Sequence, residues 1–224
     1  MSSESKSIVC LISGRGSNLE AILRTSRDEG WGTGQRTACA MRVAAVVSNR
    51  RDARGLEVAR AYGVPTTVLP HADFVSREAF DSALSKAIDL HQPALVVLAG
   101  FMRVLTPAFV ARYHGRLLNI HPSLLPAFPG LETHRRALEA GVRVHGATVH
   151  FVSDQLDGGP IVAQAAVPVR PDDSEEALAA RVLEQEHVIL PRCVRWFVEG
   201  RVRLEGERVV ADDVARPELL VVAR

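Results

Sequence analysis

Two side chains able to act on a carbonyl group stand close together in the chain, at Asn119 and His121. They end a short apolar run that starts at Leu117. Because alternate residues of a strand point to the same side, we expect both to face one cavity. An amide can donate a hydrogen bond to a developing oxyanion, and an imidazole can move or donate a proton. The pair predicts a reaction in which a carbonyl oxygen gains negative charge, with no Ser or Cys nucleophile.

A carboxylate that could complete this site lies in a later turn, at Asp157. Beside His121 it would fix the orientation of the ring and stabilise its protonated form. There is also a purely structural interpretation, in which Asn119 and His121 satisfy backbone groups where the chain leaves a sheet and Asp157 only begins a turn. That interpretation needs a separate explanation for each residue, whereas one site explains all three.

A glycine-rich segment directly after the first apolar run reads SGRGSNLE, from Ser13 to Glu20. Its two glycines permit a tight turn, and free N–H groups at the start of the following helix favour an anion such as phosphate. The alternative is an ordinary strand-to-helix turn, in which Ser17 and Glu20 form a capping box. Both interpretations require a strand, a turn and a helix in this order.

The same segment argues against nucleotide cofactors. Leu19 stands where the dinucleotide fingerprint has its third glycine, and the second strand ends in Ser48-Asn49-Arg50 instead of an acidic residue for a ribose. The chain also has no GxxxxGK[ST] motif. NAD binding and nucleoside triphosphate hydrolysis are therefore disfavoured.

Short apolar runs alternate with segments of helical periodicity along the chain. The runs predicted as strands are Ile8–Ile12, Val43–Val47, Val64–Leu69, Leu95–Leu98 and Leu117–Ile120. This order is typical of an α/β fold with a mostly parallel, twisted sheet flanked by helices. Val142–Val152 and Ile161–Val169 flank a turn-rich segment and predict an antiparallel extension in the C-terminal half.

We expect a single domain over residues 1–224. It would consist of a phosphate-binding βαβ half at 7–115, a catalytic half with a long C-terminal helix at 116–200, and a peripheral tail at 201–224. Within the first half, Gly30–Thr37 is predicted to be a surface loop. Thr106 has the form of an N-cap, with Pro107 at the first helical position.

The long helix is predicted to run from Asp173 or Ser174 towards Gly200. Asp173 and Glu176 have the spacing of a capping box, and Pro191 is expected to kink or divide the helix. Beyond Gly200 the chain is expected to form a peripheral strand or hairpin.

The composition favours a soluble enzyme that acts on small molecules. The net charge is +1, with Lys and Arg scattered along the chain, so we expect no nucleic-acid partner and no membrane association. The three cysteines and eight histidines match no zinc spacing, which predicts reduced thiols and no metal site. No targeting segment is visible after the polar residues at the N-terminus, so a cytoplasmic location is expected.

Eight motifs in one order, from Ile8 to about Gly200, resemble the folate-dependent phosphoribosylglycinamide formyltransferase (glycinamide ribonucleotide transformylase) family of purine biosynthesis. The motifs are SGRGSNL (13–19), VVSNR (46–50), SREAFD (76–81), LAGFMRVL (98–105), LLNIHPSLLP (117–126), HGATVHF (145–151), LDGGPI (156–161) and QEH (185–187). The resemblance implies a Rossmann-like formyltransferase fold. It also implies transfer of the formyl group of 10-formyltetrahydrofolate to the amine of glycinamide ribonucleotide.

The resemblance assigns roles to matching residues. It implies that Asn119, His121 and Asp157 are catalytic. The residues it implies for substrate binding are Gly16, Ser17, Asn18 and Glu186, and those for the folate site are Arg77, Met102, Arg103, Val104 and Leu105. Without it, Arg77 and Glu186 would be interpreted as solvated helix residues and the 102–105 segment as core packing.

Two positions depart from the family pattern: Arg15 where a small or neutral residue is common, and Ala147 where a hydroxyl residue is frequent. Three alternative functions stay open. A formyltetrahydrofolate deformylase uses water in place of the amine but usually carries an extra N-terminal domain. Methionyl-tRNA formyltransferase needs a longer chain and a basic surface. A non-catalytic metabolite-binding protein could retain the fold. The chain is expected to be a monomer or weak homodimer.

Overall fold

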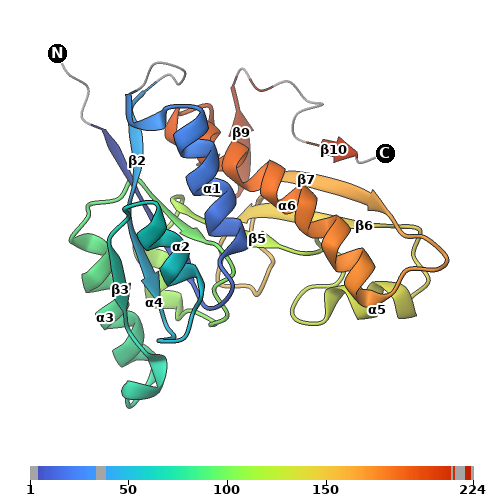
Figure 1. The fold of residues 1–224 in the computed structure, drawn as a ribbon, viewed down its shortest axis with the longest axis horizontal. Helices are drawn as coiled ribbons and strands as arrows, with labels where there is room; N and C mark the ends of the chain where they lie inside the picture. Colours follow the sequence, from blue (N-terminus) through green and yellow to red (C-terminus); the bar gives the residue numbers. More distant parts are fainter. Residues whose placement is uncertain (1–4, 34–38, 213, 215–219, 223–224) are drawn as a thin grey trace.

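The computed structural model describes residues 5–33, 39–212, 214 and 220–222. Its main sheet has eight strands in the order β10-β7-β6-β5-β4-β1-β2-β3 (Figure 1). The strands are β1 (Lys6–Ile12), β2 (Met41–Ser48), β3 (Thr66–Val68), β4 (Leu95–Leu98), β5 (Leu117–His121), β6 (Val144–Phe151), β7 (Ile161–Pro168) and β10 (Leu220–Val222). The expected strands are confirmed, with β3 shorter than the apolar run that predicted it.

Strand direction changes after β5, within the half predicted at 116–200. Strands β1 to β5 pair in parallel, as expected from the helical segments that connect them. Strand β6 runs antiparallel to both β5 and β7, which forms the antiparallel extension. Strand β10, from the expected peripheral tail, pairs in parallel with β7 and so extends the main sheet.

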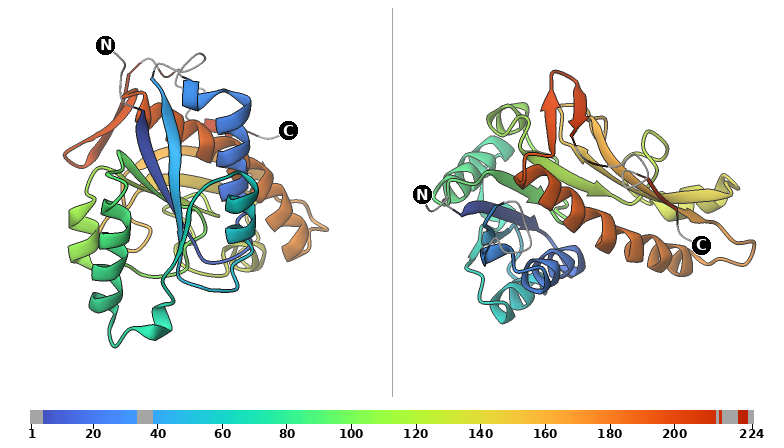
Figure 2. Two further views of the ribbon diagram at one scale, coloured as in Figure 1. Left: turned by 60° about the vertical axis from the view of Figure 1, so that its left-hand side comes forward. Right: turned by 90° about the horizontal axis from the view of Figure 1, so that it is seen from above.

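Helices cover both faces of the sheet (Figure 2). One core cluster packs α1 (Ser17–Asp28), α2 (Gly55–Ala61), α5 (Thr133–Glu139) and α6 (Glu175–Val198) on one face. The other cluster packs α3 (Arg77–Asp89) and α4 (Pro107–Arg112) on the opposite face. Along β1, Ile8, Cys10 and Ile12 belong to the first cluster, whereas Val9 and Leu11 belong to the second. This alternation explains the continuous apolar run, because both faces of the strand are buried.

The predicted cap of α4 is confirmed, but that of α6 is wrong. The Thr106 hydroxyl accepts a hydrogen bond from the Phe109 N–H. At the start of α6, the Ser174 hydroxyl accepts from the Ala177 N–H, while Asp173 forms an ion pair with Arg181 at 2.6 Å. The hydroxyl one residue later therefore replaces the predicted Asp173–Glu176 box.

Two further expectations need correction. Of the two effects expected of Pro191, a kink or a division, the division does not occur, because helix α6 continues through this residue. In the predicted surface loop Gly30–Thr37, Trp31 is fully buried at the start of a 3₁₀ turn and donates to the Glu29 carboxylate at 2.8 Å. Residues 34–37 lie outside the described residues. The expected hairpin after Gly200 is formed by β8 (Val202–Glu205) and β9 (Arg208–Ala211).

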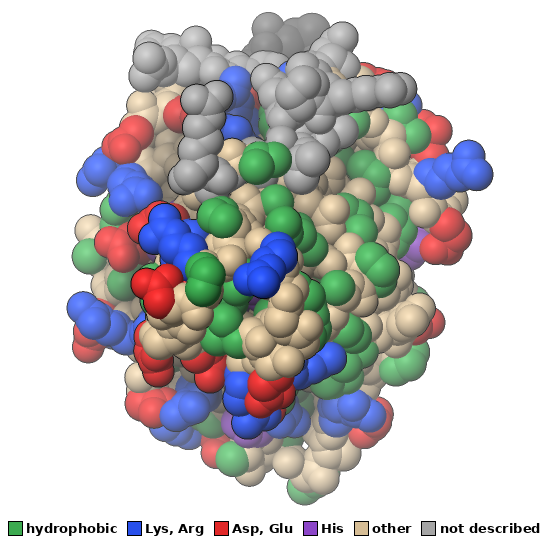
Figure 3. Space-filling model, turned by 90° about the vertical axis from the view of Figure 1, so that its right-hand side faces the viewer, with side chains coloured by type: hydrophobic (Ala, Val, Ile, Leu, Met, Phe, Trp, Pro, Cys, Tyr) green, Lys and Arg blue, Asp and Glu red, His purple; other side chains and the backbone are tan. Residues whose placement is uncertain are grey.

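The surface charge is mixed in sign on the face drawn in Figure 3, where acidic and basic side chains are interspersed. Across the described ranges, no helix combines the length and apolar character that a bilayer crossing needs.

Candidate active site

The candidate site lies at the carboxyl edge of the sheet, where β1, β4 and β5 end side by side. Leu11 pairs with Leu98, and Leu98 pairs with Asn119. Two strand spacings of ~4.8 Å therefore separate Leu11 from Asn119, about 10 Å in all. The chain continues from β1 to β2 and β3 on one side and returns to β4 on the other. Such a change of side opens a crevice at the carboxyl ends of the strands, where open α/β sheets bind ligands.

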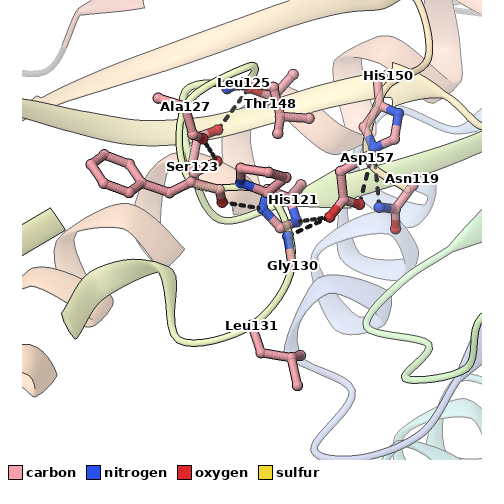
Figure 4. Close-up of polar contacts among 12 residues, drawn as sticks. Asn119, His121, Ser123, Leu125, Ala127, Gly130, Leu131, Thr148, His150 and Asp157 are labelled. Atoms are coloured by element: carbon pink, nitrogen blue, oxygen red, sulfur yellow. Dashed lines mark hydrogen bonds and ion pairs between the residues drawn. The ribbon is translucent and has the colours of Figure 1, made fainter. Parts of the chain in front are cut away.

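The structure brings His121 and Asp157 together (Figure 4). The Nδ1 atom of His121 lies 3.4 Å from the Asp157 carboxylate, and both side chains are about nine-tenths buried. The same carboxylate oxygen accepts a hydrogen bond from the Gly130 N–H at 2.8 Å. Asp157 therefore contacts both the imidazole and the loop that follows β5.

Asn119 reaches this pair through His150. The two residues are opposite each other in the β5–β6 ladder, and the Asn119 Nδ2 atom lies 3.2 Å from His150 Nε2. That nitrogen is also 3.9 Å from the second carboxylate oxygen of Asp157. Burial lowers the pKa of His150, which favours its neutral form. A neutral His150 can accept a hydrogen bond from one N–H of the Asn119 amide. The carbonyl oxygen and the second N–H of Asn119 then stay available for other partners.

The other nitrogen of His121 faces a backbone carbonyl. Its Nε2 atom lies 3.0 Å from the Phe128 oxygen, and because a carbonyl oxygen only accepts, Nε2 is the donor. His121 is thus held between Asp157 and the loop at 122–130. In this position the ring can exchange a proton on the Asp157 side while the loop fixes its plane.

A buried hydroxyl holds that loop in place. Thr148, opposite His121 in the β5–β6 ladder, donates to the Ser123 carbonyl at 2.7 Å and accepts from the Leu125 N–H at 3.0 Å. The Gln164 amide donates to the Thr148 hydroxyl at 3.1 Å. The neighbouring Ala147, at the position where the family frequently has a hydroxyl residue, is fully buried. The hydroxyl that supports the loop belongs to Thr148, one residue later.

The turn that carries Asp157 is tightly constrained. Asp157 itself has φ of +50°, an uncommon conformation for a residue with a side chain. A Cβ atom at Gly159 would lie 1.8 Å from the Phe151 carbonyl oxygen, so only glycine fits there. The turn therefore presents Asp157 at a fixed position close to the end of β6.

The glycine-rich segment forms the predicted turn into α1, and the capping box that was the alternative interpretation does not form. Gly16, with φ of +79°, is the N-cap residue, no side chain caps this end, and Ser17 is the first helical residue. A Cβ atom on Gly16 would lie 2.4 Å from the Cα atom of Gly55. The Gly55 N–H also donates to the Gly14 carbonyl at 3.0 Å. The uncapped helix start leaves backbone N–H groups available for an anion.

Asn18 and Glu186 are brought together although 168 residues separate them. Asn18 donates to the Glu186 carboxylate at 2.6 Å, and their exposed fractions are 8% and 7%. Burial raises the pKa of Glu186, and the Asn18 hydrogen bond opposes this shift. Among the described residues, the Asn18 side-chain oxygen has no hydrogen-bond partner. The pair therefore places one unsatisfied polar atom beside the start of α1.

The residues expected at the folate site lie near the end of β4. Met102 and Val104 are 68% and 58% exposed, which is unusual for apolar side chains in core packing. Arg103 is half-buried, and its Nε atom has no hydrogen-bond partner within the part of the chain that the structure describes. Leu105 packs against the core cluster of α3 and α4.

Arg77 is exposed at the first turn of α3. It lies four residues before Asp81, whose carboxylate accepts from the Thr106 N–H at 2.7 Å. Residues four apart share one face of a helix. Arg77 therefore lies one helical turn from the Asp81–Thr106 hydrogen bond, which is made directly after the 102–105 segment. No hydrogen bond or ion pair joins Arg77 to residues 102–105 among the described residues.

The other histidines near the site support the loop. His145 and His134 stack edge to face at 5.3 Å, and Phe128 stacks on His145 at 5.8 Å. Burial lowers the pKa of His145 to about 4 and also lowers that of His134, so both are neutral near pH 7. Within the described ranges, no three His, Cys, Asp or Glu side chains are grouped to hold a metal ion.

From the sequence, Ser13 is only the first residue of the candidate phosphate segment, and Asn49, Thr148 and Gln164 have no assigned role. Ser13 and Asn49 lie within two of the quoted motifs, at the ends of β1 and β2, and Thr148 lies in a third. Gln164 interrupts the apolar residues of β7. A polar residue inside an otherwise apolar strand was the available signal for Thr148 and Gln164.

Comparison with known proteins agrees with this geometry. Residues 6–194 match the formyl transferase family. The chain is 51% identical to phosphoribosylglycinamide formyltransferase from Escherichia coli (strain K12), over 94% of this chain and 99% of that protein. The chain belongs to the phosphoribosylglycinamide formyltransferases of the formyl transferase family.

Solved structures of this family share the fold. The phosphoribosylglycinamide formyltransferase from Coxiella burnetii has a TM-score of 0.87 and 44% identity, with 99% of this chain and all of that chain covered. A formyltetrahydrofolate deformylase from Pseudomonas syringae has a TM-score of 0.83 and 29% identity. The match covers 95% of this chain but only 67% of the deformylase. The closer likeness is thus to the phosphoribosylglycinamide formyltransferases.

Proposed function

We propose that the protein transfers the formyl group of 10-formyltetrahydrofolate to the amine of glycinamide ribonucleotide. The observation that carries the proposal is the convergence of Asn119, His121 and Asp157 at the sheet edge, about 10 Å from the end of the strand that leads into the glycine turn. An acyl-transfer site and an anion site therefore lie within the span of one phosphorylated amine.

The phosphate of the ribonucleotide would bind the backbone N–H groups at Gly16, Ser17 and Asn18. This role is supported by the uncapped start of α1 and by the positive end of its dipole. Glu186 would accept hydrogen bonds from the ribose hydroxyls, since only one of its carboxylate oxygens is engaged by Asn18. These contacts would hold the amine in front of Asn119 and His121.

The folate would lie along the 102–105 segment. The exposed side chains of Met102 and Val104 offer apolar surface for a planar ring, and the backbone of Arg103 and Leu105 offers donors and acceptors. Arg77, one helical turn from this segment, would attract the carboxylates at the far end of the folate. The formyl group would then enter between the segment and β5.

The transfer is direct and needs no covalent enzyme intermediate. The amine nitrogen forms a bond to the formyl carbon, and Asn119 donates a hydrogen bond to the oxygen that gains negative charge. His121, oriented by Asp157 and the Phe128 carbonyl, moves protons on its Asp157 side. The bond from the formyl carbon to the folate nitrogen then breaks. Overall, one proton passes from the attacking amine to that leaving nitrogen.

The test is the consumption of 10-formyltetrahydrofolate by purified protein with and without glycinamide ribonucleotide. We expect consumption only when the ribonucleotide is present. Equal consumption without it would identify a deformylase, and binding of both ligands without turnover would identify a binding protein. Either of these two results would overturn the proposal.

A further inference from the structure

Ser13 connects the glycine turn to the segment after β4. It stands at the end of β1 with an exposed fraction of 5%. Its backbone N–H donates to the Gly100 carbonyl at 3.1 Å, and its hydroxyl accepts from the Met102 N–H at 2.7 Å. One residue thus holds two successive peptide groups of the 100–102 segment, and the next residue, Gly14, opens the candidate phosphate turn.

These two contacts determine how the segment is oriented. In a trans peptide the C=O and N–H groups point in opposite directions. Because the Gly100 carbonyl and the Met102 N–H both face Ser13, the N–H and the carbonyl of Phe101 both point away from it. Ser13 therefore selects which backbone groups of the segment are left for other partners.

The hydroxyl of Ser13 is itself oriented by a second buried residue. It donates to the Asn49 side-chain oxygen at 2.6 Å, and Asn49 is 3% exposed at the end of β2. A hydroxyl has one proton, so this donation directs its lone pairs towards Met102. The Asn49 amide nitrogen lies 3.1 Å from His71 Nδ1, which fixes the amide in turn. The network runs across the ends of three neighbouring strands.

We infer that Ser13 is a positioning residue for the folate segment, acting through the Met102 peptide. The inference rests on the proposed function, which assigns residues 102–105 to the folate. Loss of the hydroxyl leaves the partly buried Met102 N–H without its acceptor, so the segment would relax away from the orientation that the ring requires. The effect would fall on folate binding and not on the chemistry at His121, which no contact of Ser13 reaches.

The test compares Ser13→Ala with Ser48→Ala. Ser48 is a matched control, because it is a fully buried serine at the end of the adjacent strand β2. Among the described residues, its hydroxyl exchanges hydrogen bonds only with the backbone of Arg50. Both variants lose one buried hydroxyl, but only one loses a contact with the folate segment.

We expect Ser13→Ala to raise the KM for 10-formyltetrahydrofolate about tenfold, the effect of one hydrogen bond of ~1.4 kcal/mol. The kcat and the KM for the ribonucleotide should change by less than about threefold, and Ser48→Ala should leave all three values near those of the wild type. Should Ser13→Ala fail to fold, Asn49→Ala, which frees the same hydroxyl, is expected to raise the same KM by a smaller factor.

Binding of tetrahydrofolate, measured by calorimetry without turnover, gives a reading that does not need the transfer reaction. Weaker binding in Ser13→Ala alone would support the inference even if the wild type failed to formylate the ribonucleotide. Equal KM and binding in Ser13→Ala and the wild type, with only a lower melting temperature, would reduce Ser13 to a structural residue and overturn the inference. Failure of the wild type to bind tetrahydrofolate would overturn it as well.

Discussion

Replacement of Asp157 by Asn isolates the charge beside His121. The Asn side chain has the same shape, and its carbonyl oxygen can still accept the Gly130 N–H that Asp157 accepts at 2.8 Å. The contact of 3.4 Å with His121 Nδ1 loses its negative charge. Asp157→Asn therefore removes the stabilisation of a charged imidazole and leaves the loop contact in place.

The two expected effects differ in size. Proton transfer by a positioned imidazole contributes about 10²–10⁴ in rate, so a drop in kcat of ~10²–10³ is expected, equivalent to about 3–4 kcal/mol. The retained hydrogen bond to Gly130 limits the loss of folding stability to about 1 kcal/mol. In a chain of this length that loss corresponds to a fall in melting temperature of about 2–4 °C.

Steady-state formyl transfer and thermal unfolding on the same preparation measure both effects. Asp154→Asn is the matched control, because Asp154 is exposed in the same turn and the substitution removes the same charge. It should leave kcat unchanged. A kcat for Asp157→Asn within threefold of that of Asp154→Asn would refute the assignment of Asp157 to the reaction.

Three further substitutions test other parts of the site. Gly16→Ala places a Cβ atom 2.4 Å from the Cα atom of Gly55, at a residue whose φ is +79°. The distorted turn should raise the KM for the ribonucleotide at least about tenfold, and an unchanged KM would exclude the turn as the phosphate site. Thr148→Val leaves buried backbone groups of the loop without partners. This loss should lower the folding stability measured by chemical denaturation by about 1–3 kcal/mol and should also lower kcat. Unchanged values would show that Thr148 does not support the loop. Glu186→Gln retains an oxygen for Asn18 but no charge, so the KM for the ribonucleotide should rise, and an equal KM would remove Glu186 from the site.

The same Glu186→Gln variant predicts a pH dependence of stability. Burial raises the pKa of the folded carboxyl above its ordinary value of 4.5. The contribution of Glu186 to folding stability is therefore fully present below pH 4.5, and it is lost as the pH rises through the pKa of the folded state. Melting temperatures measured from pH 4 to pH 8 should fall for the wild type relative to Glu186→Gln. If the melting temperatures of the two proteins changed in parallel with pH, the raised pKa of Glu186 in the folded protein would be contradicted.

Much of the fold could be predicted because its signals are local. The apolar runs of β1, β2, β4 and β5 are buried on both faces, and Thr106 followed by Pro107 marks the start of α4. Local signals failed where two groups compete for one role. Ser17 has the spacing of an N-cap, but the close approach of Gly55 requires a glycine in the left-handed conformation one residue earlier.

The candidate site was predictable only where its residues sit in motifs. Asn119 and His121 share one strand, so their spacing alone places them together. Glu186 reads as a surface residue among neighbouring charges, and it is buried only because α6 packs on α1. The role of Ser13 depends on the pairing order of β1, β2 and β4, which no local pattern specifies.

The central claim is that the formyl carbon passes directly to the amine at Asn119, His121 and Asp157. The most direct measurement uses 10-formyltetrahydrofolate labelled with ¹³C in the formyl group, mixed with glycinamide ribonucleotide and followed by NMR. We expect the label to appear in the formamide of the product in a one-to-one ratio with tetrahydrofolate, and His121→Ala to slow the formation of both products greatly. Label recovered as free formate, or transfer by His121→Ala at the wild-type rate, would contradict it.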